Sequence, residues 1–322
     1  MISRQNELLE RSRKSIHYYV HEDQEELSRP GFYSHMLVED VSSGIMPFRG
    51  TKIWETFKVV ISPNSSDIEN LVILALGEQY HRRALEEVVC DFCRECSQLL
   101  MSYGEAIYEI SYLIDDEDKK VGFDLNYINP RTLRRRIGKI FQYVPREIAE
   151  ERQVSEFIEL SPNDILIFQA PKYIRNDFPN ILSSLKYLDK HQFTGIDVRK
   201  FMPESQHSNY DFKLHRYYLQ LALAHSFKKI GWNVRQLFED DMLEYYILHR
   251  RLLFEKFKIE LRQSILATLN IGLGRAGKQM GFQAIIQIEG LPSLNDVDEM
   301  RNKLESGDLN FNDIMYRFSF FP

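Results

Sequence analysis

Apolar positions recur along this chain with a helical period in some stretches and with strand-like density in others. The clearest helix is predicted from about Tyr80 to Met101, where apolar side chains recur every three or four residues: Leu85, Val88, Phe92, Cys96 and Leu99. Gly104 is expected to end this helix. Upstream, Ser66 and Glu69 have the spacing of a capping box, which predicts that a helix begins there.

Stretches rich in β-branched and aromatic residues predict the strands. Glu105 to Ile114 and Val121 to Ile128 flank a polar stretch and predict a β-hairpin, which Asn129-Pro130 ends. Further strands are predicted at Lys52 to Ile61, in short segments of 131–160, at Asp164 to Gln169 and at Phe282 to Ile288. Residues 1–50 are polar and interrupted by Pro and Gly, so they predict an N-terminal arm and loop with one helix near its start.

The second half of the chain predicts long helices. A helix is expected from Pro179 to His191, followed by a polar loop from Thr194 to Asn209. The helical pattern then runs from Asp211 to Ile271, with one break at Gly231-Trp232-Asn233. The glycines that follow are expected to stop it: Gly272, Gly274 and Gly277.

Two short helices are predicted at the end of the chain. One runs from Leu294 to Glu305, capped by Ser293 or Asn295 and ended by Gly307, and the other from Asn312 to Phe318. Together these patterns predict a mixed α+β fold, with a β-hairpin and strand-rich N-terminal half and long α-helices in the C-terminal half.

Charge and cysteine content narrow the function classes. The 322 residues include 41 Lys and Arg against 47 Asp and Glu, a net charge of −6, so no positive field over the whole molecule draws it to nucleic acid or to a membrane. Three cysteines do not form a disulfide framework in a chain of this length, and no signal peptide or membrane span is expected. We expect a cytosolic chain with reduced thiols.

The glycine run Gly272 to Lys278 matches the dinucleotide pattern G-x-G-x-x-G and most of the phosphate-loop pattern. Both motifs need a strand that leads into a helix, whereas here a helix is predicted to lead into a strand. Gln279 also replaces the hydroxyl residue that binds magnesium. The run is therefore interpreted as a helix stop.

The cysteines form the pattern C-x-x-C-x-x-C at Cys90, Cys93 and Cys96. On a helix the outer two thiols lie ~9 Å apart along the axis, so they do not close one metal site, and they are interpreted as core residues. No catalytic spacing of His, Ser or paired acids is found.

The densest basic cluster holds Arg134, Arg135 and Arg136, with Arg131 and Lys139 nearby. Two interpretations stay open. The cluster contacts phosphate, or it is an exposed strand edge protected by charge, and we favour the second because no regular aromatic interleaving accompanies the arginines.

The order of these pieces resembles the portal proteins of tailed bacteriophages. Residues 101–110 (MSYGEAIYEI) look like the family's entry to a hairpin strand, and the second strand ends at residues 127–130 (YINP). Residues 160–168 (LSPNDILIF) look like the strand before the stem helix, and residues 304–311 (LESGDLNF) look like the closing helix, glycine and short helix. The resemblance covers roughly residues 50–318.

The resemblance implies a homo-oligomeric ring, commonly a dodecamer, at one capsid vertex, through which double-stranded DNA is packaged and ejected. Such a portal protein, or head-tail connector, is not an enzyme and carries no cofactor or metal. Its implied partners are the major capsid protein, the packaging motor ATPase and a head-tail adaptor, with no membrane. The implied location is the virion, assembled in the host cytoplasm.

The resemblance also divides the chain. The implied regions are an N-terminal arm (1–50), a wing-like α+β region (51–130), a clip-like strand region (131–177), a stem helix with a tunnel-type loop (178–210), and a long-helix wing with a short C-terminal region (211–322). Residues expected near nucleic acid are Lys186, Lys190, Arg199, Lys200, Arg134, Arg135 and Arg136.

Two apolar groups are expected to pack on neighbouring subunits. One lies on the stem helix (Ile181, Leu185 and Leu188), and the other flanks the main row of the longest helix (Leu243, Tyr246 and Ile247). Two other function classes stay open: a nucleic-acid-processing enzyme with dispersed carboxylates, and a helical scaffold that binds a protein partner.

Overall fold

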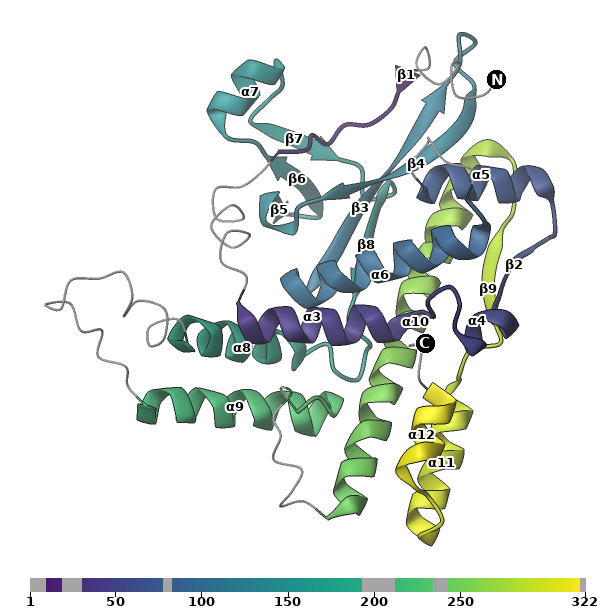
Figure 1. The fold of residues 1–322 in the computed structure, drawn as a ribbon. Helices are drawn as coiled ribbons and strands as arrows, with labels where there is room; N and C mark the ends of the chain where they lie inside the picture. Colours follow the sequence, from purple (N-terminus) through teal and green to yellow (C-terminus); the bar gives the residue numbers. More distant parts are fainter. Residues whose placement is uncertain are drawn as a thin grey trace, which may run out of the picture.

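Helix α10 (Glu244–Met280) runs through the molecule and joins its β-rich part to its helical part (Figure 1). The computed structural model describes residues 10–18, 31–77, 83–192, 212–233, 235 and 243–318. No helix among these residues is both long enough and apolar enough to cross a membrane.

Helices occupy most of the described chain. Their bounds are α3 (Phe32–Ile45), α4 (Lys52–Thr56), α5 (Ser66–Leu76), α6 (Leu85–Tyr103), α7 (Arg146–Arg152), α8 (Phe178–Gln192), α9 (Phe212–Ile230), α11 (Leu294–Ser306) and α12 (Phe311–Phe318). The strands are β1 (Glu10–Arg11), β2 (Lys58–Ser62), β3 (Glu105–Ile114), β4 (Lys120–Ile128), β5 (Leu133–Arg136), β6 (Lys139–Tyr143), β7 (Phe157–Leu160), β8 (Ile165–Gln169) and β9 (Ile285–Glu289). The mixed α+β class predicted from the sequence is confirmed.

The strands form three antiparallel sheets. In the largest, β3 pairs with β4 along one side and with β8 and β1 along the other. Strands β5, β6 and β7 form a second sheet in chain order, so β5 is an edge strand. The third sheet pairs β2 with β9, two strands more than 200 residues apart along the chain, which ties the two halves together.

The main core fills the space between the largest sheet, α3, α6, α8 and α10. Ring contacts mark its centre: Phe92 of α6 lies 5.4 Å from Tyr108 of β3 and 5.7 Å from Phe168 of β8, measured between centroids. Aromatic pairs at this distance add to the stabilisation that burial gives. The core thereby fixes α6 against the two strands that border the site described below.

Residues 10–18 are docked on two sheets. The Glu109 carboxylate of β3 accepts hydrogen bonds from the Lys14 N–H (3.0 Å) and the Ser15 N–H (2.9 Å). The Gln142 amide of β6 bonds both backbone groups of Ile16, the N–H at 2.9 Å and the carbonyl at 2.7 Å. This part of the predicted N-terminal arm is therefore held by specific contacts to β3 and β6.

Asp189 of α8 closes the N-terminus of α3. Its carboxylate accepts hydrogen bonds from the Tyr33 N–H (2.6 Å), the Ser34 N–H (3.0 Å) and the Ser34 hydroxyl (2.5 Å). The first N–H groups of a helix have no partner within the helix, and the positive end of the helix dipole favours an anion. Gly31 leaves the room for this contact, since a Cβ there would lie 2.2 Å from Asp189 Oδ2.

Arg262 of α10 closes the other end of α3. Its buried guanidinium donates to the carbonyls of Ile45 (3.2 Å) and Pro292 (2.6 Å). Burial lowers the pKa of Arg262 to about 10, because the charged form loses hydration. A cation at the negative end of α3 complements the anion at its positive end, so the helix is fixed by residues that follow it far along the chain.

Several elements agree with the sequence prediction. The helix that ends at Gly104, the hairpin of β3 and β4, strand β8 and helix α8 all stand where the patterns place them. Helix α11 begins with a Ser293–Asp296 capping box and ends at Gly307. Helix α12 and strand β9 are also confirmed.

Other predictions are wrong. Residues 32–45, read as part of the arm and loop, form α3, and the first half of the strand predicted at Lys52 to Ile61 is α4, capped by the Thr51 side chain. Within 131–160, α7 lies among the short strands. Helix α5 begins at Ser66, where a helix was predicted, but it is capped at Ser65 without a side-chain hydrogen bond, so the Ser66–Glu69 box itself does not form. Helix α6 begins at Leu85, and residues 78–82 lie outside the described part.

The glycines of α10 do not stop the helix, which continues to Met280 and ends at Gly281 with φ 79°. They allow close packing instead. A Cβ on Gly272 would lie 2.5 Å from Leu166 Cδ1, and one on Gly277 would lie 2.3 Å from the Phe282 carbonyl oxygen. The loop predicted at Thr194 to Asn209 lies outside the described residues.

Candidate functional site

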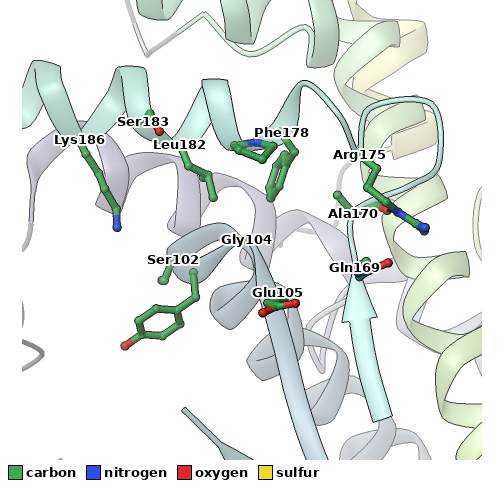
Figure 2. A pocket seen from close by; sticks show the side chains of 12 residues that line it. Ser102, Gly104, Glu105, Gln169, Ala170, Arg175, Phe178, Leu182, Ser183 and Lys186 are labelled. Atoms are coloured by element: carbon green, nitrogen blue, oxygen red, sulfur yellow. Dashed lines mark hydrogen bonds between the residues drawn. The ribbon is translucent and has the colours of Figure 1, made fainter. Parts of the chain in front are cut away.

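An open pocket of about 400 Å³ lies where the end of α6, the start of β3, the end of β8 and the start of α8 meet (Figure 2). Polar and apolar side chains share its walls: Ser102, Tyr103, Gly104, Glu105, Gln169, Ala170, Arg175, Phe178, Pro179, Leu182, Ser183 and Lys186. These residues come from two stretches that are far apart in the sequence, 102–105 and 169–186.

Local structure places each wall of the pocket. Gly104 adopts φ 86°, a left-handed conformation that glycine accepts without strain, so α6 turns directly into β3. Glu105 and Gln169 are register partners across β3 and β8, and they therefore lie side by side at the mouth. Helix α8 begins beside them, with Pro179 in its first turn, where a missing N–H costs nothing.

The charges around the pocket are mostly positive. Lys186 lies on an exposed part of α8, and Arg175 precedes α8, donating through Nε to the Ala170 carbonyl at 3.4 Å. Figure 2 shows these two side chains on opposite sides of the pocket, with Glu105 between them. The carboxylate of Glu105 is already paired with Arg135 of β5 at 3.0 Å. A bound group would therefore meet a net positive site.

The predicted basic cluster reaches the same place. Besides the Arg135–Glu105 pair, the guanidinium of Arg131 lies 5.4 Å from the centre of the Tyr103 ring, a cation–π contact at the pocket wall. Arg134 and Arg136 are exposed on β5, and Arg134 donates to the Arg131 carbonyl at 2.7 Å. The edge position of β5 agrees with the interpretation of a strand edge protected by charge. Contact with phosphate stays a prediction.

The other predicted site residues fall into two groups. Lys186 lines the pocket, and Arg135, 51 positions earlier in the chain, pairs with Glu105, another residue of the pocket wall. Lys190 belongs to α8, but its side chain is outside the described part, as are Arg199 and Lys200.

One expectation about α8 is wrong. Ile181, Leu185 and Leu188 were expected to pack on neighbouring subunits, and each is fully buried within its own chain. Helix α8 packs on α3 and α9, which cover this apolar face. The surface that α8 leaves exposed carries Ser183, Lys186 and Tyr187 instead.

The other pocket residues carry little signal in the sequence. Glu105 and Gln169 stand at the ends of predicted strands, a signal that places them at a sheet rim but not next to each other. No periodic pattern in the sequence marks Arg175 or Tyr103 as a site residue. They line the pocket because of the way that α6 and α8 meet.

The two motifs weighed in the sequence have structural roles. The glycine run lies inside α10, so the strand-to-helix turn that cradles phosphate is not formed there. Cys90, Cys93 and Cys96 are buried on α6, as the packing interpretation predicts. Burial raises the pKa of Cys93 to about 12, so its thiolate, the form that binds metals, is disfavoured. Among the described residues, no group of His, Cys, Asp or Glu is placed to hold a metal ion.

Comparisons with known proteins found similarity among solved structures. No protein-family model and no curated protein sequence matches this chain. Among solved structures, the chain is similar to an HK97 family phage portal protein from Corynebacterium diphtheriae, with 9% sequence identity and a TM-score of 0.36. The aligned region covers 83% of this chain and 94% of that chain.

Proposed function

We propose that this chain is a portal-type subunit, and that copies of it form a ring, of about twelve subunits, through which double-stranded DNA passes into and out of a capsid. The observation that carries the proposal is the order of elements. The hairpin of β3 and β4, strand β8, helix α8, the long helix α10, strand β9 and the pair of α11 and α12 around Gly307 follow the order that the sequence resemblance expects.

In this proposal the regions keep the boundaries given by the resemblance. Residues 51–130 form the wing-like part, 131–177 the clip-like part, 178–210 the stem and tunnel-type loop, and 211–322 the long-helix wing and C-terminal part. The proposed partners are the capsid protein, the packaging motor ATPase and a head-tail adaptor, and the proposed location is the virion.

The charge distribution supports passage of DNA. A channel must guide a duplex without holding it, because each phosphate that a protein neutralises adds to its affinity. The chain is acidic overall, with a net charge of −6, and two of its cations, Arg175 and Lys186, line one pocket. Weak, local attraction in an acidic ring suits a sliding duplex.

Exposed apolar side chains support assembly. At the start of α10, Leu243 is 71% exposed and Tyr246 is 53% exposed, while Tyr245 beside them is 47% exposed. Exposed apolar side chains are a feature of surfaces that contact another protein. We propose that a neighbouring subunit covers it.

The test is the mass and shape of the native particle. Native mass spectrometry and electron microscopy of purified protein at micromolar concentration are expected to give a closed ring with a central opening. Leu243→Asp is expected to prevent the ring, because a charge would enter the proposed interface.

Ile271→Asp is the matched control for this test. Ile271 lies on the same helix and is 55% exposed, but it is 28 positions away from Leu243, so this variant should still form the ring. A sharp 38.2 kDa monomer of the unmodified chain, with and without capsid protein, would contradict the proposal.

A further inference from the structure

The pair of helices α8 and α9 is strongly basic within an acidic chain. Its sequence holds six Lys or Arg residues and one acidic residue, a formal charge of +5, whereas the whole chain has −6. The cations are Lys186, Lys190, Lys213, Arg216, Lys228 and Lys229. The single acid, Asp189, is buried against the N-terminus of α3 and does not offset this charge at the surface.

Three tyrosines form a cluster between the same two helices. The ring of Tyr187 on α8 stacks on Tyr218 of α9, with centroids 5.5 Å apart and planes at 13°. Tyr217 meets Tyr218 edge to face at 5.4 Å. Tyr187 is 52% exposed and Tyr217 is 57% exposed, so two ring surfaces of this tyrosine cluster face solvent.

Cations flank the tyrosine cluster on both helices. Lys186 adjoins Tyr187 in sequence and is exposed. On α9, Lys213 lies four residues before Tyr217, which places these two side chains on one face of the helix. Arg216 precedes Tyr217 in the sequence and is also exposed. Figure 1 shows α8 and α9 side by side, with α9 on the outside of the helical part. Exposed aromatic rings and positive charge thus share one accessible surface.

We infer that this α8–α9 surface binds single-stranded nucleic acid. Bases of a single strand stack on the exposed faces of Tyr187 and Tyr217, and the backbone phosphates lie near Lys213, Arg216 and Lys186. Stacking on tyrosine does not depend on base identity, so the surface binds with little sequence preference. This inference goes beyond the proposed ring, because a duplex keeps its base faces stacked inside and would leave the tyrosines unused.

Two other occupants make different demands on the surface. A duplex would be attracted by the charge alone, and removing the tyrosine rings would not weaken it. The same surface of a second copy would be repelled, since both carry a formal charge of +5. Single-stranded nucleic acid alone uses both the rings and the cations.

The experiment measures fluorescence anisotropy of labelled oligothymidine of about 15 nucleotides, an unstructured probe, with the full chain. Tyr187→Ala combined with Tyr217→Ala is expected to weaken binding by about a hundredfold, which is roughly tenfold for each stacked base. A duplex of the same length is expected to bind more weakly than the single strand, and its affinity is expected to be the same for this variant.

The matched control is Phe157→Ala combined with Tyr316→Ala. These aromatic side chains are 48% and 83% exposed, and they lie on β7 and α12, outside the α8–α9 surface. The control is expected to bind oligothymidine like the unmodified chain. Equal losses in the two aromatic variants, or no loss in the Tyr187 and Tyr217 variant, would overturn the inference.

A charge variant tests the phosphate contacts separately. Lys213→Gln combined with Arg216→Gln is expected to reduce the slope of log affinity against log salt by roughly 1.4, since each phosphate contact with a single strand contributes about 0.7. An unchanged slope would show that these cations do not contact the strand. All of the substituted side chains are exposed, so circular dichroism is expected to show an unchanged fold.

The native mass of each sample separates this inference from the ring proposal. Single-strand binding by a monomer would uphold the α8–α9 surface and contradict the ring. A ring that falls apart when Tyr187 and Tyr217 are replaced, with no binding of oligothymidine by the unmodified chain, would show that a second copy covers the surface and would overturn the inference.

Discussion

At the residue scale, Asp189 links α8 to the N-terminus of α3. It lies three residues after Lys186, and its carboxylate accepts three hydrogen bonds from the first turn of α3. This contact sets the position of α8 along α3, and with it the place of Lys186 at the pocket. A structural carboxylate in the core and a surface cation are therefore coupled through one helix.

Replacing Asp189 by Ala is expected to lower the free energy of unfolding by about 2 kcal/mol, because the buried N–H groups of Tyr33 and Ser34 lose their acceptor. Asp189→Asn keeps one acceptor oxygen and is expected to cost less. Chemical denaturation monitored by circular dichroism checks both values. Equal stability of the Ala variant and the unmodified chain would contradict this role.

The pH dependence of stability gives a second test of Asp189. Burial raises the pKa of this carboxyl above its ordinary 3.8, and the hydrogen bonds from Ser34 and Tyr33 lower it in part. At a pH between the two pKa values, the Asp189 carboxyl is protonated in the folded state and ionised in the unfolded state. The stabilisation that results is full below the pKa of the unfolded state, and it is lost as the pH rises through the pKa of the folded state.

The melting temperature of the unmodified chain, relative to Asp189→Asn, is consequently expected to fall as the pH rises above about 4. The Asn variant has no titrating group at this position and therefore serves as the reference for the unmodified chain. If the melting temperatures of the two proteins changed by the same amount between about pH 4 and pH 7, this would contradict the raised pKa of Asp189.

At the element scale, elements with local sequence signals were predicted correctly, whereas the end of α10 was not. The hairpin of β3 and β4 and helix α11 are specified by local signals, such as Gly104 and the Ser293–Asp296 capping box, and both were predicted. The glycines of α10 look like a helix stop, yet they serve contacts with Leu166 and Phe282, which lie elsewhere in the fold. Local propensity gives way there to packing.

Helix α3 was missed for the same reason. It contains Ser42 and Gly44, which weaken a helical signal, but Gly44 lies against the buried Lys258 side chain, where a Cβ would be 2.7 Å from Nζ. The candidate site was predicted in part: the pattern pointed to Lys186 and Arg135 separately. Lys186 and Glu105, the partner of Arg135, reach one pocket only because α6, β3 and α8 meet, and a single sequence does not contain that information.

Alanine substitutions at two nearby glycines of α10 are expected to change the free energy of unfolding in opposite directions. Gly274 is exposed with open space around its Cβ position, so Gly274→Ala is expected to raise the free energy of unfolding by ~0.5–1 kcal/mol. Gly277→Ala is expected to lower it by about 1–3 kcal/mol, since the new Cβ would meet the Phe282 backbone. Denaturant titration of both variants measures the two changes.

Gly272→Ala is the intermediate case in this series. Its Cβ would meet the end of the Leu166 side chain, which can shift, so its cost is expected to fall between those of the other two variants. Equal effects at the three positions would contradict the packing role of these glycines.

At the scale of the whole molecule, charge is divided unevenly. Acidic residues outnumber basic ones along the chain, while β5, the pocket and the α8–α9 pair are basic. Surface charges act over about 10 Å at ordinary salt, so each basic region acts on its own neighbourhood. A ring of such subunits would present a few positive zones in an acidic frame.

Charge reversal on α8 tests whether this helix lies near DNA in the proposed ring. Lys186→Glu combined with Lys190→Glu is expected to leave ring assembly intact and to impair packaging or retention of DNA, because two negative charges per subunit would repel the phosphates. Packaging in a reconstituted capsid system, measured by nuclease protection, checks this.

The matched control is Lys119→Glu in the turn between β3 and β4, an exposed lysine far from α8 along the chain. It changes the charge of the chain in the same direction and is expected to package normally. Rings that fall apart in the double variant would place these lysines at a subunit interface, and unchanged packaging would place them away from the DNA.

The two ends of α3 also govern when the chain can finish folding during synthesis. The Tyr33 N–H has no acceptor until Asp189 is synthesised, 156 residues later. The Ile45 carbonyl has no donor from Arg262 until that residue is synthesised, 217 residues later. At a ribosome speed of about 5–20 residues per second, the second delay is roughly 10–40 s. Until then α3 has at least one uncapped end and an exposed apolar face. A nascent chain that stops before α10 would therefore remain a target for chaperones and proteases, however complete its first half.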